Sequence, residues 1–474
     1  MSGPGTKRNR LVVFSGGSAA NSIVDVFNGL LSSGEAGKGQ SGNGLKLQKL
    51  SYVIGISDNG GSTSEILRVF GGPGIGDVRS RLIRLAPEPT GTSEEDSVKT
   101  AIKHLLNYRL PADEDLAKEE WLSVVEGTHL KWKKIPSDKR ELLRSFLVHL
   151  HSEILKRARP PLSTFNFHSA SIGNLFLTST RLFFGSFESA IYLFQSITGV
   201  PENVQVVPAI NSMFSHHIAA GLTDGTVIVG QNQISHPTLS WPSPALGQSI
   251  GTESGESDDT EGEGDGVEDA NLPGSHPSLK SRNIVFEKDN EPELGSRVER
   301  VWYINPYGQE IRPPANPKVV GALGEAGAVV FSIGSLYTSI IPCLILRGIG
   351  HVLSSPHIPF KILILNGSLD RETGPVTGNP QVDFSASDFI RAIVRACVDS
   401  QSNIFIPPGE YVKYVTHVVY LEGRCVPKVD VEELGRWGIR AVKVEGQSLV
   451  KKKGVYYEVE RLKEALGGII EGRL

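Results

Sequence analysis

The chain has 474 residues, 39% of them apolar, and a formal net charge of −4 at pH 7. This length allows one large domain, or two to three ordinary ones, with a sizeable core. Nine acidic residues lie within 251–270, which leaves +5 (−4 plus 9) on the remainder. A remainder this weakly basic suits a small anionic ligand and does not indicate nucleic-acid binding.

The three cysteines, Cys343, Cys397 and Cys425, are far apart and lack C-x-x-C spacing. They therefore indicate neither a zinc site nor a disulfide framework, and reduced thiols in the cytosol are the simpler interpretation. An uncharged run over 327–346 is long enough to span a bilayer, but glycines, a proline and hydroxyl groups interrupt it. We therefore expect a cytoplasmic protein with no membrane segment.

Apolar runs alternate with helical patterns along the chain. The first run, 11–14, predicts a buried strand, and 19–31 predicts a helix with one apolar face. The other predicted strands are 52–56, 204–207, 328–332, 361–365 and 415–420, with a hairpin over 222–229 around an Asp-Gly turn. The other predicted helices are 62–70, 77–85, 172–184, 385–396 and 458–470. This order predicts an α/β, Rossmann-like fold of three layers, a mostly parallel sheet with helices on both faces.

Two segments depart from this alternation. The segment 87–160 is charged and helical in pattern, so we expect a helical insertion there. The segment 243–283 is acidic, rich in Gly and Ser, and almost without large apolar residues, so we expect a disordered loop. It serves either as a solvated insertion or as a partner-binding or regulatory segment. The segments 87–160 and 243–283 are both expected to lie within a single domain over 1–474.

Polar, glycine-rich turns follow several predicted strands, where ligands bind in doubly wound sheets. After the first strand come Gly16, Gly17 and Ser18. Glycine there lets the backbone approach a phosphate beside a helix N-terminus, although a simple tight turn explains the glycines too. A dinucleotide fingerprint would need glycines at 16, 18 and 21, and the chain has Ser18 and Asn21. An NAD-dependent oxidoreductase is therefore disfavoured.

The turn after the second strand contains a carboxylate. It consists of Asp58, Asn59, Gly60 and Gly61. Asp58 can hold a divalent cation that bridges phosphate oxygens, while the other three complete a cradle for the phosphate. Alternatively, Asp58 only caps the helix that follows.

Further candidates lie in three later turns. At the next helix start, Asp77 can act as a cap and Arg79 can form a forked contact with a phosphate, unless it is an ordinary surface arginine. His168 can donate to a phosphate or act as an acid or base, unless its role is structural; Asn174 follows it in the same polar cluster. The last turn offers amides and hydroxyls to an anion through Gly334, Ser335, Tyr337, Thr338 and Ser339.

Together these motifs resemble the CofD-like family, which includes 2-phospho-L-lactate transferases and the YvcK regulators. The resemblance is carried by FSGGS (14–18), SDNGGSTSEILR (57–68), GDVRSRLIRLA (76–86), HSASIGNLFL (168–177) and GSLYTSIIPCLI (334–345). It implies a Rossmann-like fold that binds a nucleoside diphosphate conjugate. Two departures stand out: Asn59 occupies the place of the family's usual second acid, and the stretch from His168 to Asn174 is longer than usual.

The resemblance implies two functions. In a transferase, Asp58 would hold Mg²⁺, the turns at 16–18 and 334–335 would cradle phosphates, and Arg79 would stabilise charge while a phospho group is transferred. Asp58, Arg79 and His168 are then the candidate catalytic residues. In a regulator of carbon metabolism, a gluconeogenesis factor, the same site would bind a UDP-sugar without catalysis. The loss of an acid at Asn59 weakens metal binding more than sugar-nucleotide binding. A homodimer remains open.

Overall fold

The computed structural model describes residues 8–17, 19–31, 45–88, 93–160, 163–236, 276, 292–376, 384–402, 405–448 and 454–474. At its centre lies a sheet of seven strands in the order β11-β10-β9-β8-β1-β2-β3, and every neighbouring pair is parallel. The strands are β1 (Arg10–Phe14), β2 (Lys49–Ile54), β3 (Val204–Pro208), β8 (Ala326–Phe331), β9 (Phe360–Ile364), β10 (His417–Tyr420) and β11 (Arg440–Lys443). The predicted α/β, Rossmann-like fold is confirmed.

The central strands are short apolar runs buried on both faces. Every residue of β1 and β8 is buried, and Phe14 stacks on Phe331 at 5.7 Å between ring centroids. Strands covered by helices on both sides are expected to lack polar alternation, which explains why simple apolar runs predicted them. The strand order reverses between β1 and β8, so the loops that follow these two strands meet at one edge of the sheet.

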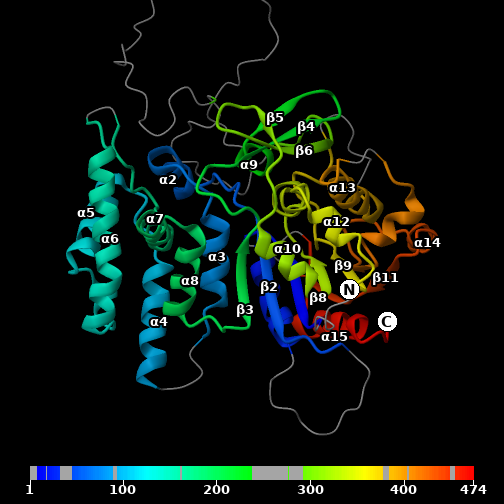
Figure 1. Cartoon of the computed structure of the whole chain (residues 1–474), viewed down its shortest axis with the longest axis horizontal. Coiled ribbons are helices and arrows are strands. Elements are labelled where there is room, and N and C mark those ends of the chain that lie inside the picture. Colours follow the sequence, from blue (N-terminus) through cyan, green and yellow to red (C-terminus); the bar gives the residue numbers. More distant parts are fainter. Residues whose placement is uncertain are drawn as a thin grey trace, which may run out of the picture.

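Helices surround this sheet (Figure 1). Those of five residues or more are α1 (Val24–Gly29), α2 (Ser62–Phe70), α3 (Gly76–Leu85), α4 (Glu94–Leu106), α5 (Glu114–Glu126), α6 (Ser137–Arg157), α7 (Ile172–Phe184), α8 (Phe187–Thr198), α9 (Gln231–Ser235), α10 (Pro317–Gly324), α12 (Ile349–Leu353), α13 (Ala386–Asp399), α14 (Val431–Arg436) and α15 (Val459–Ile470). The helix predicted over 19–31 begins as a 3₁₀ turn, Ala19–Ile23, before α1. No helix in the described ranges is long and apolar enough to cross a membrane.

A second sheet lies above the carboxyl edge of the first (Figure 1). It is antiparallel, in the order β5-β4-β6-β7, with β4 (His217–Leu222), β5 (Val227–Val229), β6 (Val298–Ile304) and β7 (Glu310–Ile311). The β4–β5 hairpin was predicted, and Gly225 adopts φ 89° in its turn. The pairing with β6 and β7 was not predicted. Helix α9 follows β5 directly and leads the chain from this sheet towards the main one.

Helices α4, α5 and α6 form a block at one side of the molecule (Figure 1). Ser93 and Asp113 cap the first two helices through their side chains, and Trp121 and Trp132 are buried within the block. The helical pattern predicted for 87–160 is therefore present, while its status as an insertion stays a prediction. The acidic segment 243–283 lies outside the described residues, except for His276.

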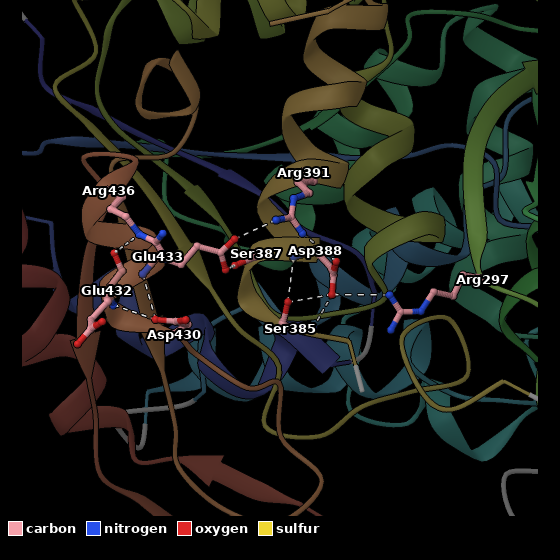
Figure 2. A network of polar contacts seen from close by, with 9 residues as sticks. All are labelled: Arg297, Ser385, Ser387, Asp388, Arg391, Asp430, Glu432, Glu433 and Arg436. Atoms are coloured by element: carbon pink, nitrogen blue, oxygen red, sulfur yellow. Dashed lines mark hydrogen bonds and ion pairs between the residues drawn. The ribbon is translucent and has the colours of Figure 1, made fainter. Parts of the chain in front are cut away.

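Helices α13 and α14 are tied together by charged side chains (Figure 2). Ser385 and Asp388 form a capping box at the start of α13, and Arg391 of α13 donates to Glu433 of α14 at 2.9 Å. Arg297, next to β6, lies 3.8 Å from Asp388. This network links the second sheet to α13 and α13 to α14, and it helps to fix their relative positions.

Candidate functional site

The loops after β1, β2 and β8 meet at the carboxyl edge of the main sheet. A Cβ atom on Gly16, after β1, would lie 2.1 Å from Oγ of Ser339, in the π-helical turn η4 (Leu336–Ile340) that follows β8. A Cβ on Gly17 would lie 2.1 Å from Oδ1 of Asp77, at the start of α3. Glycine is therefore required at both positions for these loops to approach each other, while the predicted approach of this backbone to a phosphate stays a prediction.

Asp58 and Asp77 form a pair of carboxylates at this edge. A Cβ on Gly76 would lie 2.1 Å from Oδ2 of Asp58, so the start of α3 presses directly against the Asp58 turn. Asp58 accepts hydrogen bonds from the Gly60 amide and the Thr63 hydroxyl, both at 3.0 Å. These bonds fix the turn before α2, but the N-cap of α2 is Gly61 and has no side-chain cap, so the alternative role of Asp58 as the helix cap was wrong.

The pKa values of both carboxyl groups are perturbed. Burial raises the pKa of Asp58 above its ordinary value, against the opposing effects of Gly60, Thr63 and Arg79. Burial and the charge of Asp58 raise the pKa of Asp77 to about 7. Two carboxylates that repel each other and are poorly hydrated favour either a shared proton or a cation between them.

The second acid of the site comes from a different element than the family pattern suggests. Asn59 accepts from the Asn232 amide of α9 at 2.9 Å, so it joins α9 to the turn. Asp77 instead supplies the second carboxylate, and Gln231 of α9 donates to it while accepting from Ser57 at 2.6 Å. The sequence named Asp77 only as a cap and phosphate contact. Two glycines were the available signal for the role of Asp77 in the site. Gly17 lies in the turn after β1, and Gly76 directly precedes Asp77.

The carboxylate pair fits the ligand set of a magnesium ion. In the described ranges no three His, Cys, Asp or Glu residues gather as a metal site. Mg²⁺ bound together with a phosphorylated ligand commonly takes only one or two protein carboxylates, with phosphate oxygens and water as its other ligands. The raised pKa values are the structural reason why Asp58 and Asp77 suit a cation.

Two arginines of α3 lie beside the pair. Arg79 is 7% exposed and donates from Nε to Asn174 Oδ1 at 3.2 Å, so it is not the surface arginine of the alternative interpretation. Asn174 in turn donates to the Ser62 hydroxyl at 3.1 Å. The sequence did not single out Arg81, which is fully buried, lies over the Tyr52 ring at 4.6 Å, and donates to the Gly16 carbonyl at 3.1 Å. It therefore fixes the β1 turn.

The turn after β8 already holds an acidic side chain. Glu372, in the loop after β9, accepts from the amides of Tyr337 and Thr338 at 2.7 and 3.2 Å, and from the Thr338 hydroxyl. The Gly334 amide donates to Asn366 at 2.9 Å. These amides were predicted to cradle a phosphate, and in this structure side chains of the same protein take them. Ser339 faces Gly16, and Ser335 precedes the turn.

The remaining predicted residues are farther along the site or outside it. The His168 ring nitrogen Nδ1 bonds to the Ala112 carbonyl between α4 and α5, and its backbone amide donates to Asn166 at 2.8 Å. These contacts suit its structural interpretation, and the predicted acid–base role stays a prediction. Gly60 and Gly61 form the Asp58 turn, where Gly61 adopts φ 51°. Ser18 lies outside the described residues.

The parallel sheet, its reversal of strand order and the glycine turns at that reversal define a Rossmann-like α/β protein. A family model described as 2-phospho-L-lactate transferase CofD matches residues 11–459. The chain therefore belongs to the CofD family, and the resemblance seen in its motifs is confirmed.

Several relatives support this assignment. The protein YNL011C of Saccharomyces cerevisiae is 39% identical over 428 residues, which are 87% of this chain and 90% of the yeast protein. The gluconeogenesis factors of Bacillus subtilis and Halalkalibacterium halodurans are 25% and 24% identical over 35% of this chain and 49% and 48% of their own lengths. Protein BH3568 of Bacillus halodurans, a member of the UPF0052 family, shares the fold with a TM-score of 0.54 at 16% identity, over 96% of this chain and 98% of that one.

Proposed function

We propose that this CofD-like protein binds a nucleoside diphosphate conjugate together with Mg²⁺ and transfers its phospho group to an acceptor. The acceptor hydroxyl attacks the phosphorus distal to the nucleoside, the phosphoanhydride bond breaks, the nucleoside monophosphate leaves and the hydroxyl proton passes to solvent. The observation that carries the proposal is the Asp58–Asp77 pair, in which burial raises the pKa of both groups and the Asp58 charge raises that of Asp77 further. It lies beside the glycine turn after β1, against which the side chains of Ser339 and Asp77 pack. A cation relieves the repulsion, and the diphosphate supplies its remaining oxygen ligands.

The residues of the site have separate roles in this proposal. The backbone at Gly16 and Gly17 lets the diphosphate approach the sheet edge, and Arg81 holds that backbone in place through the Gly16 carbonyl. Arg79 offers a guanidinium to charge that develops on the transferred group. Mg²⁺, when bound to Asp58 and Asp77, would neutralise charge on the phosphate oxygens. Without the ion, Asp77 retains a proton on its carboxyl group up to about pH 7.

The second candidate is a UDP-sugar-binding regulator without catalysis. The observation that favours it is the similarity to bacterial proteins named gluconeogenesis factors. In this function the same glycine turn grips the diphosphate, and the cation is dispensable.

A thermal-shift panel separates the two functions. The full chain is heated with GDP, GTP, UDP-sugars and NAD, each with Mg²⁺ or with EDTA, because a ligand that binds only the folded state raises the melting temperature. Asp77→Asn is compared with Asp115→Asn, which changes an exposed acid of α5 by the same charge. We expect a guanosine nucleotide to stabilise the wild type in a Mg²⁺-dependent way. Asp77→Asn should lose that dependence, and Asp115→Asn should keep it.

Other outcomes of the panel count against the proposal. A shift with a UDP-sugar that is the same in Mg²⁺ and EDTA supports the regulator and contradicts the transferase. A response to NAD alone contradicts both functions. Retention of the full Mg²⁺ dependence in Asp77→Asn removes Asp77 from the metal site.

A further inference from the structure

Arg109 is a guanidinium group close to Arg79 that the proposed phosphate site does not use. Arg79 belongs to α3, and Arg109 lies just after α4, so the helical block supplies one of the two charges. Arg79 is nine-tenths buried and packs against the first turn of α7, and Arg109 bonds to the residues just before that turn.

Backbone hydrogen bonds fix the position of Arg109. The segment around it pairs with the start of α7: the Leu110 amide donates to Ala170 at 2.9 Å and the Ile172 amide donates to Tyr108 at 3.0 Å. Arg109 itself forms a bridge with Ser171 and donates to the Ser169 carbonyl at 3.3 Å. This pairing fixes Arg109 at the N-terminal end of α7, where the helix dipole adds positive potential.

Arg79 reaches the same place from the opposite side. Its Nη1 atom donates to Asn107 Oδ1 at 3.4 Å, two residues before Arg109. A Cβ atom on Gly173 would lie 3.1 Å from Cγ and Cδ of Arg79, so glycine in the first turn of α7 makes room for the arginine stem. Arg79, Asn107, Arg109 and the start of α7 therefore border one small region.

The charges of this region are not locally paired. Among the residues that the structure describes, neither Arg79 nor Arg109 lies within 4.0 Å of a carboxylate, and their hydrogen-bond acceptors are amide and carbonyl oxygens. Asp58 and Asp77 offset Arg79 only at longer range. A buried guanidinium without a carboxylate is costly, and an anion bound in the forked geometry of arginine compensates it.

We infer that Arg79 and Arg109 form a second anion subsite, which takes a phosphate or carboxylate group of the ligand or acceptor at the junction of α3, the helical block and α7. This inference rests on the proposed function in one respect: the anionic group is assigned to the same ligand or to its acceptor. The helical block would then take part in ligand recognition, because Arg109 binds a second negatively charged group.

The test measures anion binding without nucleotide or divalent cation. The full-length wild type, Arg109→Gln and Arg140→Gln are titrated with inorganic phosphate in EDTA at constant ionic strength, followed by thermal shift, and a second titration uses acetate. Arg140→Gln, at the start of α6 in the same block, is the control for the loss of one positive charge. Arg109 is exposed, so its replacement is expected to leave the fold intact, which circular dichroism checks.

We expect saturable binding of phosphate or acetate by the wild type. Arg109→Gln should weaken it about tenfold, because a charge-assisted hydrogen bond is lost, while Arg140→Gln should stay within about twofold of the wild type. The larger response identifies the group as phosphate or carboxylate. Absence of saturable binding, or equal affinity in Arg109→Gln, overturns the inference. Failure of the nucleotide panel alone overturns only the proposed function, since this titration contains no nucleotide.

Discussion

At the residue scale, the central feature is a pair of acids whose ionisation opposes folding. Asp58 was predicted as a ligand from its place after a strand, and in the structure it lies at the carboxyl edge against Gly74 and Gly76. The partnership with Asp77 could not be predicted. It depends on how closely the start of α3 approaches the preceding turn, and sequence spacing does not give that distance. Arg81 was missed for the same reason, since burial alone distinguishes it from other arginines of α3.

Replacing Asp77 tests this electrostatic picture. The pKa of Asp77 is 3.8 in its ordinary state and about 7 in the folded chain. The folded state therefore keeps a proton that the unfolded chain has released, and stability falls as pH rises from about 4 to about 7. Asp77→Asn cannot ionise, so at about pH 8 in EDTA its free energy of unfolding should exceed that of the wild type by on the order of 4 kcal/mol.

Urea denaturation at several pH values measures this difference. At about pH 4 the two proteins should be nearly equal, because both carry a neutral group at position 77. Asp115→Asn should follow the wild type at every pH. A variant that is less stable than the wild type at alkaline pH would show that the Asp77 carboxylate stabilises the fold instead.

At the element scale, six of the seven strands of the main sheet were predicted, but β11 and the long helix α8 were not, and the connections were predicted poorly. Helices α2 and α7 have the predicted ends, Ser62–Phe70 and Ile172–Phe184, because apolar periodicity and capping residues act locally. The loop after β9 carried no such local signal. This loop places Glu372 in contact with the amides of η4, which lie about 35 residues earlier in the sequence. Glu372 therefore occupies a turn that the sequence predicted to bind phosphate.

Glu372 therefore has a testable structural role. Glu372→Ala leaves the amides of Tyr337 and Thr338 and the Thr338 hydroxyl without their acceptor, and should cost about 1–3 kcal/mol of unfolding free energy. Glu372→Gln keeps an acceptor oxygen. Burial and the Asp370 charge raise the pKa of Glu372 to about 8, so ionisation at alkaline pH destabilises the wild type but not the glutamine variant.

The expected order of stability at about pH 9 is glutamine variant, then wild type, then alanine variant. Denaturant unfolding gives the order directly. Glu410→Ala, which removes an exposed partner of Lys413, serves as the control and should change stability by less than about 0.5 kcal/mol. If the alanine variant is as stable as this control, Glu372 does not hold η4.

At the scale of the whole molecule, the class of fold followed from the alternation of strands and helices, while the second sheet did not. Strand β6 pairs with β4, from which the acidic segment separates it in the sequence, and β7, which pairs with β6, is only two residues long. This sheet matters because α9 leaves it to bring Gln231 to Asp77 and the Asn232 amide to Asn59. The site is thus assembled from both sheets, and its glycine and acid turns lie far apart in the sequence.

The most direct measurement is a crystal structure of the full chain with Mn²⁺ in place of Mg²⁺ and the nucleotide selected by the thermal-shift panel. Anomalous scattering locates the ion independently of the ligand. The account predicts one Mn²⁺ peak coordinated by Asp58 and Asp77, with the diphosphate against Gly16 and Gly17. A diphosphate bound away from these turns, or a Mn²⁺ peak on other residues, would contradict it.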